Sequence, residues 1–201
     1  HSLFVIDHHK YQDIDRSFCV SALEQFACLI SYSLNRWETG IALNDRGYIY
    51  ALKENGYSEE EILKIRQFDF EAQGYKTEYF ETLIKDYLKG YNSGKGLYVV
   101  ETNCEKTSYL SDLHFFENEK RKSRMDLVVF VTGSEKKIKE INFYGSPVRV
   151  KALQKRFGGY SGGDEKVSMF WGKDIATTMT RKNFYDSLIN SSPILFQAGK
   201  G

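Results

Sequence analysis

Residues 3–9 read Leu3-Phe4-Val5-Ile6-Asp7-His8-His9. The first four are apolar on both faces of an extended chain, a pattern typical of an interior strand in a parallel sheet. Such a strand needs neighbouring strands on both sides and helices over both faces. We therefore expect an α/β fold, and we expect earlier strands in a longer parent protein. Three polar side chains follow at the carboxyl end of this strand, where open parallel sheets bind their ligands.

Composition limits the classes of partner. The chain has 201 residues, with 28 Lys plus Arg against 27 Asp plus Glu and a formal net charge of +1. Long nucleic acid usually requires a basic track, so we expect no such partner. No apolar run approaches the roughly 20 residues of a membrane helix, so we expect no membrane partner. The three cysteines have no CxxC spacing, which favours free thiols and a cytoplasmic protein.

Apolar periodicity predicts helices before a change of pattern near residue 92. The first expected helix is Ser17–Leu34, with one buried stripe formed by Phe18, Ala22, Phe26, Leu29, Ile30 and Leu34. A second covers residues 41–52, with an interruption near Gly47. A third begins with a Ser58/Glu61 capping box, and a fourth is Thr77–Leu88. Residues 92–96, Asn-Ser-Gly-Lys-Gly, form the best linker candidate. We therefore expect two domains, residues 1–91 and 97–201.

The second expected domain alternates strands and helices. β-rich runs cover residues 97–100, 127–132 and 138–144, and the last two can form a hairpin. Ser146-Pro147 begins a helix that stops at Gly158, and residues 174–188 give another. The first domain is thus expected to be the remainder of a parallel-sheet domain with helices, and the second a smaller α+β unit.

Asp7, His8 and His9 are the sharpest chemical feature of the sequence. A carboxylate and two imidazoles at a strand end suit a borderline divalent ion such as Mn²⁺ or Zn²⁺. Polar loop residues that bind no metal are the alternative.

Two segments together resemble one family. Residues 4–9, Phe-Val-Ile-Asp-His-His, resemble the signature of the DHH phosphoesterase superfamily, which includes single-strand exonucleases, nano-RNA and pAp phosphatases, cyclic-dinucleotide phosphodiesterases and family II inorganic pyrophosphatases. Its members usually carry a second domain, DHHA1, that ends in a helix and a glycine-rich loop. Here residues 141–146 precede a predicted helix, and Phe157-Gly158-Gly159-Tyr160-Ser161-Gly162-Gly163 follows it. The two signatures occur in the family's order.

The resemblance implies a two-metal phosphoesterase, usually with Mn²⁺. His8 would be a metal ligand, and Asp7 would ligate or orient beside it. His9 would lie nearer the scissile phosphate, as a ligand or proton donor. Asp45 best matches a later metal-ligating aspartate of the family, and an ordinary turn or helix-cap acid is its alternative.

The same resemblance gives the second domain a substrate role. Gly158, Gly159, Gly162 and Gly163 would cradle the terminal phosphate or the base end of a short nucleotide, and Arg156 would supply charge. A helix cap followed by a β-turn is the alternative. Aromatic residues near this segment (Tyr144, Tyr160, Trp171) suit either base stacking or an aromatic core.

The chain also departs from the family pattern. The glycine segment continues with Asp164-Glu165-Lys166 instead of a histidine, and the family's first Asp-rich motif has no counterpart before Asp7. Because a dinuclear site needs about six protein ligands and this chain offers about four, we expect weak or incomplete metal binding.

Three readings follow from this pattern. The first is a hydrolase acting on a small nucleotide, short oligonucleotide or polyphosphate, with a homodimer left open. The second is a catalytically incomplete nucleotide- or partner-binding relative. The third is an unrelated structural or interaction protein in which Asp7-His8-His9 arises by chance.

Overall fold

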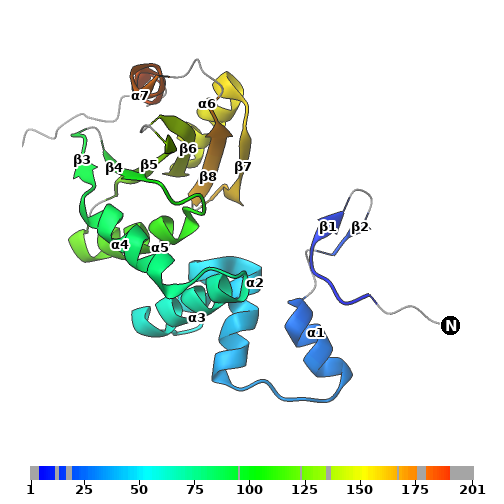
Figure 1. Cartoon of the computed structure of the whole chain (residues 1–201). Helices are drawn as coiled ribbons and strands as arrows, with labels where there is room; N and C mark the ends of the chain where they lie inside the picture. Colours follow the sequence, from blue (N-terminus) through cyan, green and yellow to red (C-terminus); the bar gives the residue numbers. More distant parts are fainter. Residues whose placement is uncertain are drawn as a thin grey trace, which may run out of the picture. The chain divides into compact units, whose positions relative to one another are not determined.

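The chain folds into two compact units, residues 1–76 and 77–201 (Figure 1). The computed structural model describes residues 5–11, 14–16, 20–94, 96–122, 124–134, 137–166, 168–175 and 180–190. The sequence placed the boundary at residues 92–96. In the structure Tyr91–Asn92 forms strand β3, which pairs antiparallel with β4 (Leu97–Thr102), so this glycine-containing stretch connects two strands of one sheet.

Unit 1 consists of a short hairpin and three helices. Its elements are β1 (Lys10–Tyr11), β2 (Ile14–Asp15), α1 (Ala22–Leu29), α2 (Arg36–Glu54) and α3 (Glu59–Ala72). Each helix begins with a capping box, in which the N-cap side chain and the N3 glutamate accept each other's backbone N–H: Ser21/Glu24, Asn35/Glu38 and Ser58/Glu61. The predicted Ser58 cap and the interruption of the second helix at Gly47 are both confirmed.

The expected interior strand is not present in the described residues. Val5 and Ile6 lie outside any strand, and Val5 is 49% exposed, while Leu3 and Phe4 fall outside the described part of the chain. A two-residue hairpin pairing cannot supply the flanking strands that such a strand needs.

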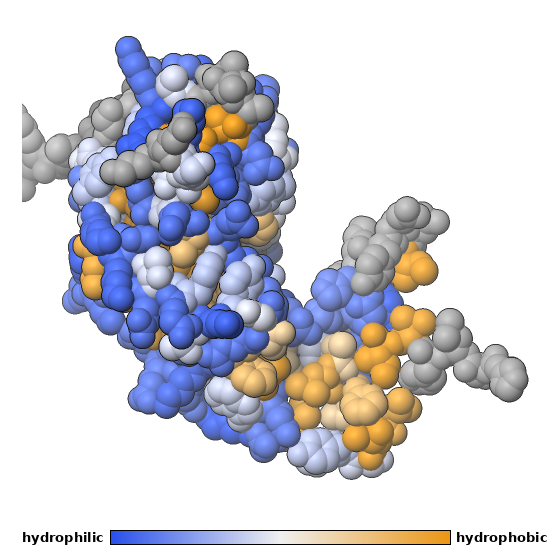
Figure 2. All heavy atoms as spheres, in the orientation of Figure 1, coloured by the Kyte–Doolittle hydropathy of each residue, from blue (hydrophilic) through white to orange (hydrophobic). Residues whose placement is uncertain are grey.

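The predicted buried stripe of the first helix is also wrong. Within α1 only Ala27 is buried, whereas Phe26, Leu29 and Ile30 are about half exposed. Figure 2 shows hydrophobic atoms gathered on the surface over α1 and the segment before it. In the described part of unit 1 the strands form only the two-residue β1–β2 pairing, which is too small to cover such a stripe.

Unit 2 is built on a six-stranded sheet in the order β3-β4-β5-β6-β8-β7. Its remaining strands are β5 (Asp126–Thr132), β6 (Ile138–Gly145), β7 (Tyr160–Asp164) and β8 (Ser168–Asp174). Only β4 and β5 pair in parallel, so the sheet is mostly antiparallel and the fold is a mixed α/β arrangement. The predicted β5–β6 hairpin is confirmed. The predicted helix at 174–188 is partly wrong, because Asp174 ends β8 and α7 spans Arg181–Asn190.

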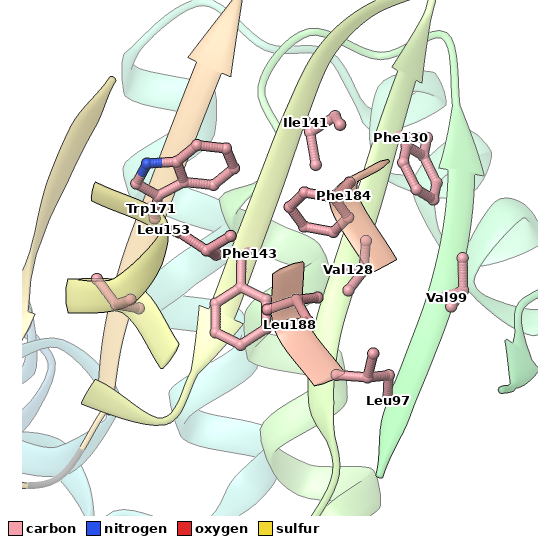
Figure 3. Packing of buried hydrophobic residues seen from close by; sticks show 11 residues of the cluster. Leu97, Val99, Val128, Phe130, Ile141, Phe143, Leu153, Trp171, Phe184 and Leu188 are labelled. Carbon is pink, nitrogen blue, oxygen red and sulfur yellow. The ribbon is translucent and has the colours of Figure 1, made fainter. Parts of the chain in front are cut away.

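One face of this sheet carries the main core. Helices α6 (Pro147–Phe157) and α7 pack on it (Figure 3), and the buried cluster consists of Leu97, Val99, Val128, Phe130, Ile141, Phe143, Val150, Leu153, Trp171, Phe184 and Leu188. The parallel and antiparallel strands contribute every second residue to this face, as the pleat requires. Trp171 is fully buried here, so it belongs to the core rather than to a base-stacking site.

On the opposite face, α4 (Thr77–Leu88) packs on β4 and on α5 (Ser108–Arg121), and the Tyr98 ring of β4 stacks on His114 of α5. A buried histidine links these helices to the sheet: His114 Nε2 lies 2.8 Å from the Met125 carbonyl oxygen, and its Nδ1 lies 3.0 Å from the Tyr87 hydroxyl. A carbonyl only accepts, so Nε2 carries the proton and Nδ1 accepts from Tyr87. Among the described helices, none is both long and apolar enough to cross a membrane.

Candidate metal centre

Asp7, His8 and His9 gather their side chains at one point of unit 1. One ligand atom from each lies within 4.8 Å of the others. The His9 Nδ1 lies 2.7 Å from Asp7 Oδ1, and the His8 and His9 rings are 4.2 Å apart. The same Asp7 oxygen accepts the backbone N–H of His8 at 2.8 Å and of His9 at 3.3 Å. Asp7 therefore folds this short segment back on itself and orients the imidazole of His9.

Asp45 approaches this cluster from α2. Its Oδ2 lies 3.6 Å from His8 Nε2. The His8 side chain is only 10% exposed and that of Asp45 is 46% exposed, so the pair lies at the border between interior and solvent. Asp45 thus contacts His8, whereas the cluster of ligand atoms within 4.8 Å consists of Asp7, His8 and His9.

Two side chains hold the main chain of this segment, which has no regular secondary structure. The Asp7 carbonyl accepts from Gln25 Nε2 at 2.8 Å and from Arg16 Nε at 3.2 Å. Arg16 also donates to the Val5 carbonyl at 2.9 Å, and its backbone N–H donates to His9, which closes the β1–β2 hairpin. Because no ladder satisfies these carbonyls, Arg16 and Gln25 do so and fix the segment in space.

A further ion pair connects the start of α1 to the residue after Asp45. Glu24 closes the α1 capping box with Ser21, and its carboxylate also lies 3.2 Å from Arg46 Nε. Gln25 is the next residue of α1. The helix that anchors the Asp7 carbonyl is therefore tied to the part of α2 that carries Asp45.

Helix α2 breaks immediately beyond Asp45. Tyr48 has φ 50° and ψ −143°, a conformation that non-glycine residues rarely adopt, and it follows the non-helical Gly47. The buried Arg66 of α3 lies over the Tyr48 ring at 5.3 Å and donates to Asn44 Oδ1 at 3.1 Å. Arg66 thus contacts α2 on both sides of Asp45, which supports the kink.

The donor set fits a divalent cation. Two imidazoles and two carboxylates are the ligands that Mn²⁺ and Zn²⁺ share. His8 Nδ1 is buried and has no hydrogen-bond partner in the described part of the chain. A buried imidazole nitrogen without a partner is unusual. Asp45 faces the other ring nitrogen, Nε2, so an ion shared by His8 and Asp45 would not account for the unpartnered Nδ1.

The four predicted phosphate-binding glycines do not form one loop. Gly158 and Gly159, with φ 68° and 93°, connect α6 to β7, whereas Gly162 and Gly163 lie inside β7 and pair with β8. A Cβ on Gly159 would collide with the Gly172 carbonyl oxygen, and Arg156 lies 5.4 Å from the Phe157 ring. Contacts with backbone atoms account for Gly159 and Gly163, and the Phe170 ring accounts for Gly162. A role of these glycines in binding phosphate stays a prediction.

Comparison of the sequence with models of known protein families and with curated proteins finds no match. The supporting residues Arg16, Gln25 and Arg66 were not predicted. They are ordinary polar side chains in the sequence, and their roles depend on main-chain contacts that no spacing reveals.

Proposed function

We propose that this chain contributes the metal site of a divalent-cation-dependent phosphoesterase of the DHH/DHHA1 type. The observation that supports the proposal most is the approach of Asp45 to His8, beside Asp7 and His9. The substrate class that we propose is a phosphate ester or phosphodiester of a small nucleotide, a short oligonucleotide or a polyphosphate. Mn²⁺ is the proposed ion.

Each residue has a distinct part in this proposal. His8, Asp45 and Asp7 would hold the ion, which when bound would polarise a phosphate oxygen and acidify a water molecule. The bond from His9 Nδ1 to Asp7 Oδ1 places the lone pair of the neutral ring on Nε2. His9 is also the most exposed of the four side chains, at 60%, so a substrate can reach it. Through the Nε2 lone pair His9 would complete the ligand set, and in its imidazolium form it would transfer the Nε2 proton to the leaving oxygen.

The second candidate function is a nucleotide- or partner-binding relative without hydrolytic activity. The number of donors favours it. The described residues gather two imidazoles and two carboxylates, fewer than the roughly six protein ligands that two octahedral ions need.

Calorimetric titration of the full chain with Mn²⁺ tests the proposal. The wild type is compared with a His8→Ala/His9→Ala variant and with a control, Lys64→Ala, at an exposed ion pair of α3. We expect binding in the wild type and the control and its loss in the double variant. Hydrolysis of p-nitrophenyl phosphate diesters and of dinucleotides is then measured with Mn²⁺. Mn²⁺ binding without turnover would favour the second candidate, and equal titrations in all three proteins would refute the metal site.

A further inference from the structure

Two exposed aromatic side chains lie on the same face of neighbouring strands at one edge of the unit 2 sheet. Tyr160 of β7 lies opposite Gly172 of β8, and Gly162 of β7 lies opposite Phe170 of β8. Directly opposed residues of an antiparallel pair share a face. Trp171 points to the core on the other face, so Tyr160 and Phe170 point away from that core. They are 50% and 38% exposed.

Each ring lies along the sheet over a glycine of the partner strand. A Cβ on Gly172 would collide with Tyr160 Cζ, and a Cβ on Gly162 would come 2.8 Å from Phe170 Cζ. The two ring centroids are 6.4 Å apart and the ring planes are inclined by 57°. The glycines leave the room that allows both rings to lie on the strands instead of extending into solvent.

Hydrogen bonds fix the Tyr160 ring in this position. Its hydroxyl reaches across β8 to β6, where it donates to the Glu140 carboxylate and lies 2.9 Å from Asn142 Oδ1. Burial, and then Glu140, raise the pKa of the Tyr160 phenol, so the hydroxyl keeps its proton at neutral pH. An aromatic ring that is fixed before binding loses little conformational freedom when a ligand stacks on it.

We propose that Tyr160 and Phe170 form a stacking surface for a nucleobase. The naming of a nucleotide as the ligand rests on the proposed function, whereas the surface itself rests on the geometry of β7 and β8. Exposed aromatic rings on a sheet are a common support for unstacked bases. Glu140 at the margin of this surface accepts hydrogen bonds and can receive the exocyclic amino group of adenine, cytosine or guanine.

The charges on this face favour a base over a phosphate. Glu140 and Asp174 lie opposite each other on the same face as Tyr160, and both are acidic. A phosphate would be repelled from them, so the phosphate end of a nucleotide would point away from this surface. The stacking surface would therefore bind the base and not the phosphate, which is the group that Gly158 and Gly159 were predicted to bind.

The test titrates the full chain, without metal, with adenosine 5′-monophosphate and with ribose 5-phosphate, which lacks the base. We expect binding of the nucleotide only. Tyr160→Leu and Phe170→Leu remove the rings but keep apolar side chains, and each is expected to weaken binding about tenfold. Tyr160→Phe keeps the ring and is expected to bind within about threefold of the wild type. Tyr91→Leu is the matched control, since Tyr91 is 49% exposed at the opposite edge of the same sheet.

Equal affinity for adenosine 5′-monophosphate and ribose 5-phosphate would overturn the proposal, and so would unchanged nucleotide affinity in both leucine variants. The rings would then have only the structural role of covering glycines. If the leucine variants are unfolded at the assay temperature, NMR of the wild type tests the proposal instead. The ring-proton signals of Tyr160 and Phe170 must shift when the nucleotide is added and stay unchanged when ribose 5-phosphate is added. The His8→Ala/His9→Ala variant separates the two proposals. It is expected to bind the nucleotide like the wild type, even where the Mn²⁺ titration fails.

Discussion

His8 Nε2 lies 3.6 Å from the carboxylate of Asp45, although the two residues belong to different segments of unit 1. An acid that served only as a helix cap would accept a backbone N–H at the start of a helix. Asp45 instead lies inside α2, just before the kink at Gly47 and Tyr48, and faces an imidazole. Such a carboxylate–imidazole contact beside a second histidine is typical of metal sites, in which each donor is held by its neighbours.

Replacement of Asp45 by asparagine tests its place in the site. The Asp45→Asn variant keeps the size of the side chain and removes its charge, so we expect the dissociation constant for Mn²⁺ to rise about tenfold or more. The measurement is calorimetric titration at fixed pH. Asp86→Asn, which removes an acid paired with Lys89 in unit 2, serves as the control. Identical constants for the Asp45 variant and the wild type would exclude Asp45 from the site.

Gln25 is expected to act through the main chain of Asp7. The Gln25→Ala variant removes the 2.8 Å hydrogen bond to the Asp7 carbonyl while leaving all four donor side chains in place. We expect Mn²⁺ affinity to fall about tenfold, as on removal of other groups that position metal ligands. Gln67→Ala is the control, because Gln67 makes a comparable 2.8 Å bond to Glu71 on exposed α3. An equal loss of affinity in both variants would mean that Gln25 does not position the site.

Local signals in the sequence predicted much of the secondary structure. The capping box of Ser58 and Glu61, the interruption near Gly47 and the helix from Pro147 to Gly158 are all encoded within a few residues. The pairing of strands was harder to predict from the sequence. The β7 segment of the β7–β8 hairpin was predicted as a glycine-rich loop, because such a run lacks the β-branched residues that mark a strand. Gly162 and Gly172 are explained by the rings of Phe170 and Tyr160, each of which lies on the strand opposite its glycine.

The candidate site shows the same division. Asp7, His8 and His9 are adjacent in sequence, so their proximity required no knowledge of the fold. Asp45 was selected from the resemblance to a family, and the folded chain brings it to His8. Apolar periodicity gave the wrong result for α1, since a stripe predicts only that one side is hydrophobic and not that another element covers it.

Asp126 is expected to stabilise the start of α6. Ser146 makes no side-chain cap bond, whereas the Asp126 carboxylate accepts its backbone N–H at 3.0 Å and a bond from Arg149 Nη1 at 2.7 Å. Asp126 is buried, so Asp126→Ala removes the acceptor of both hydrogen bonds and is expected to cost about 1–3 kcal/mol. Urea denaturation measures this cost. Glu165→Ala, which breaks an exposed pair with Lys151, is expected to cost less than about 1 kcal/mol.

His114 should make the stability of unit 2 depend on pH. Burial lowers the pKa of His114 below its usual 6.5, while the Met125 carbonyl and the charges of Asp126 and Glu117 act in the other direction. Below about pH 6.5 the unfolded chain therefore binds a proton that the folded chain does not, and the free energy of unfolding falls as pH falls towards the lowered pKa. Urea denaturation at pH 7.5 and 5.5 should show this loss in the wild type and a smaller one in His114→Gln. The glutamine variant does not titrate in this range, so an identical loss in both proteins would assign the pH dependence to other groups.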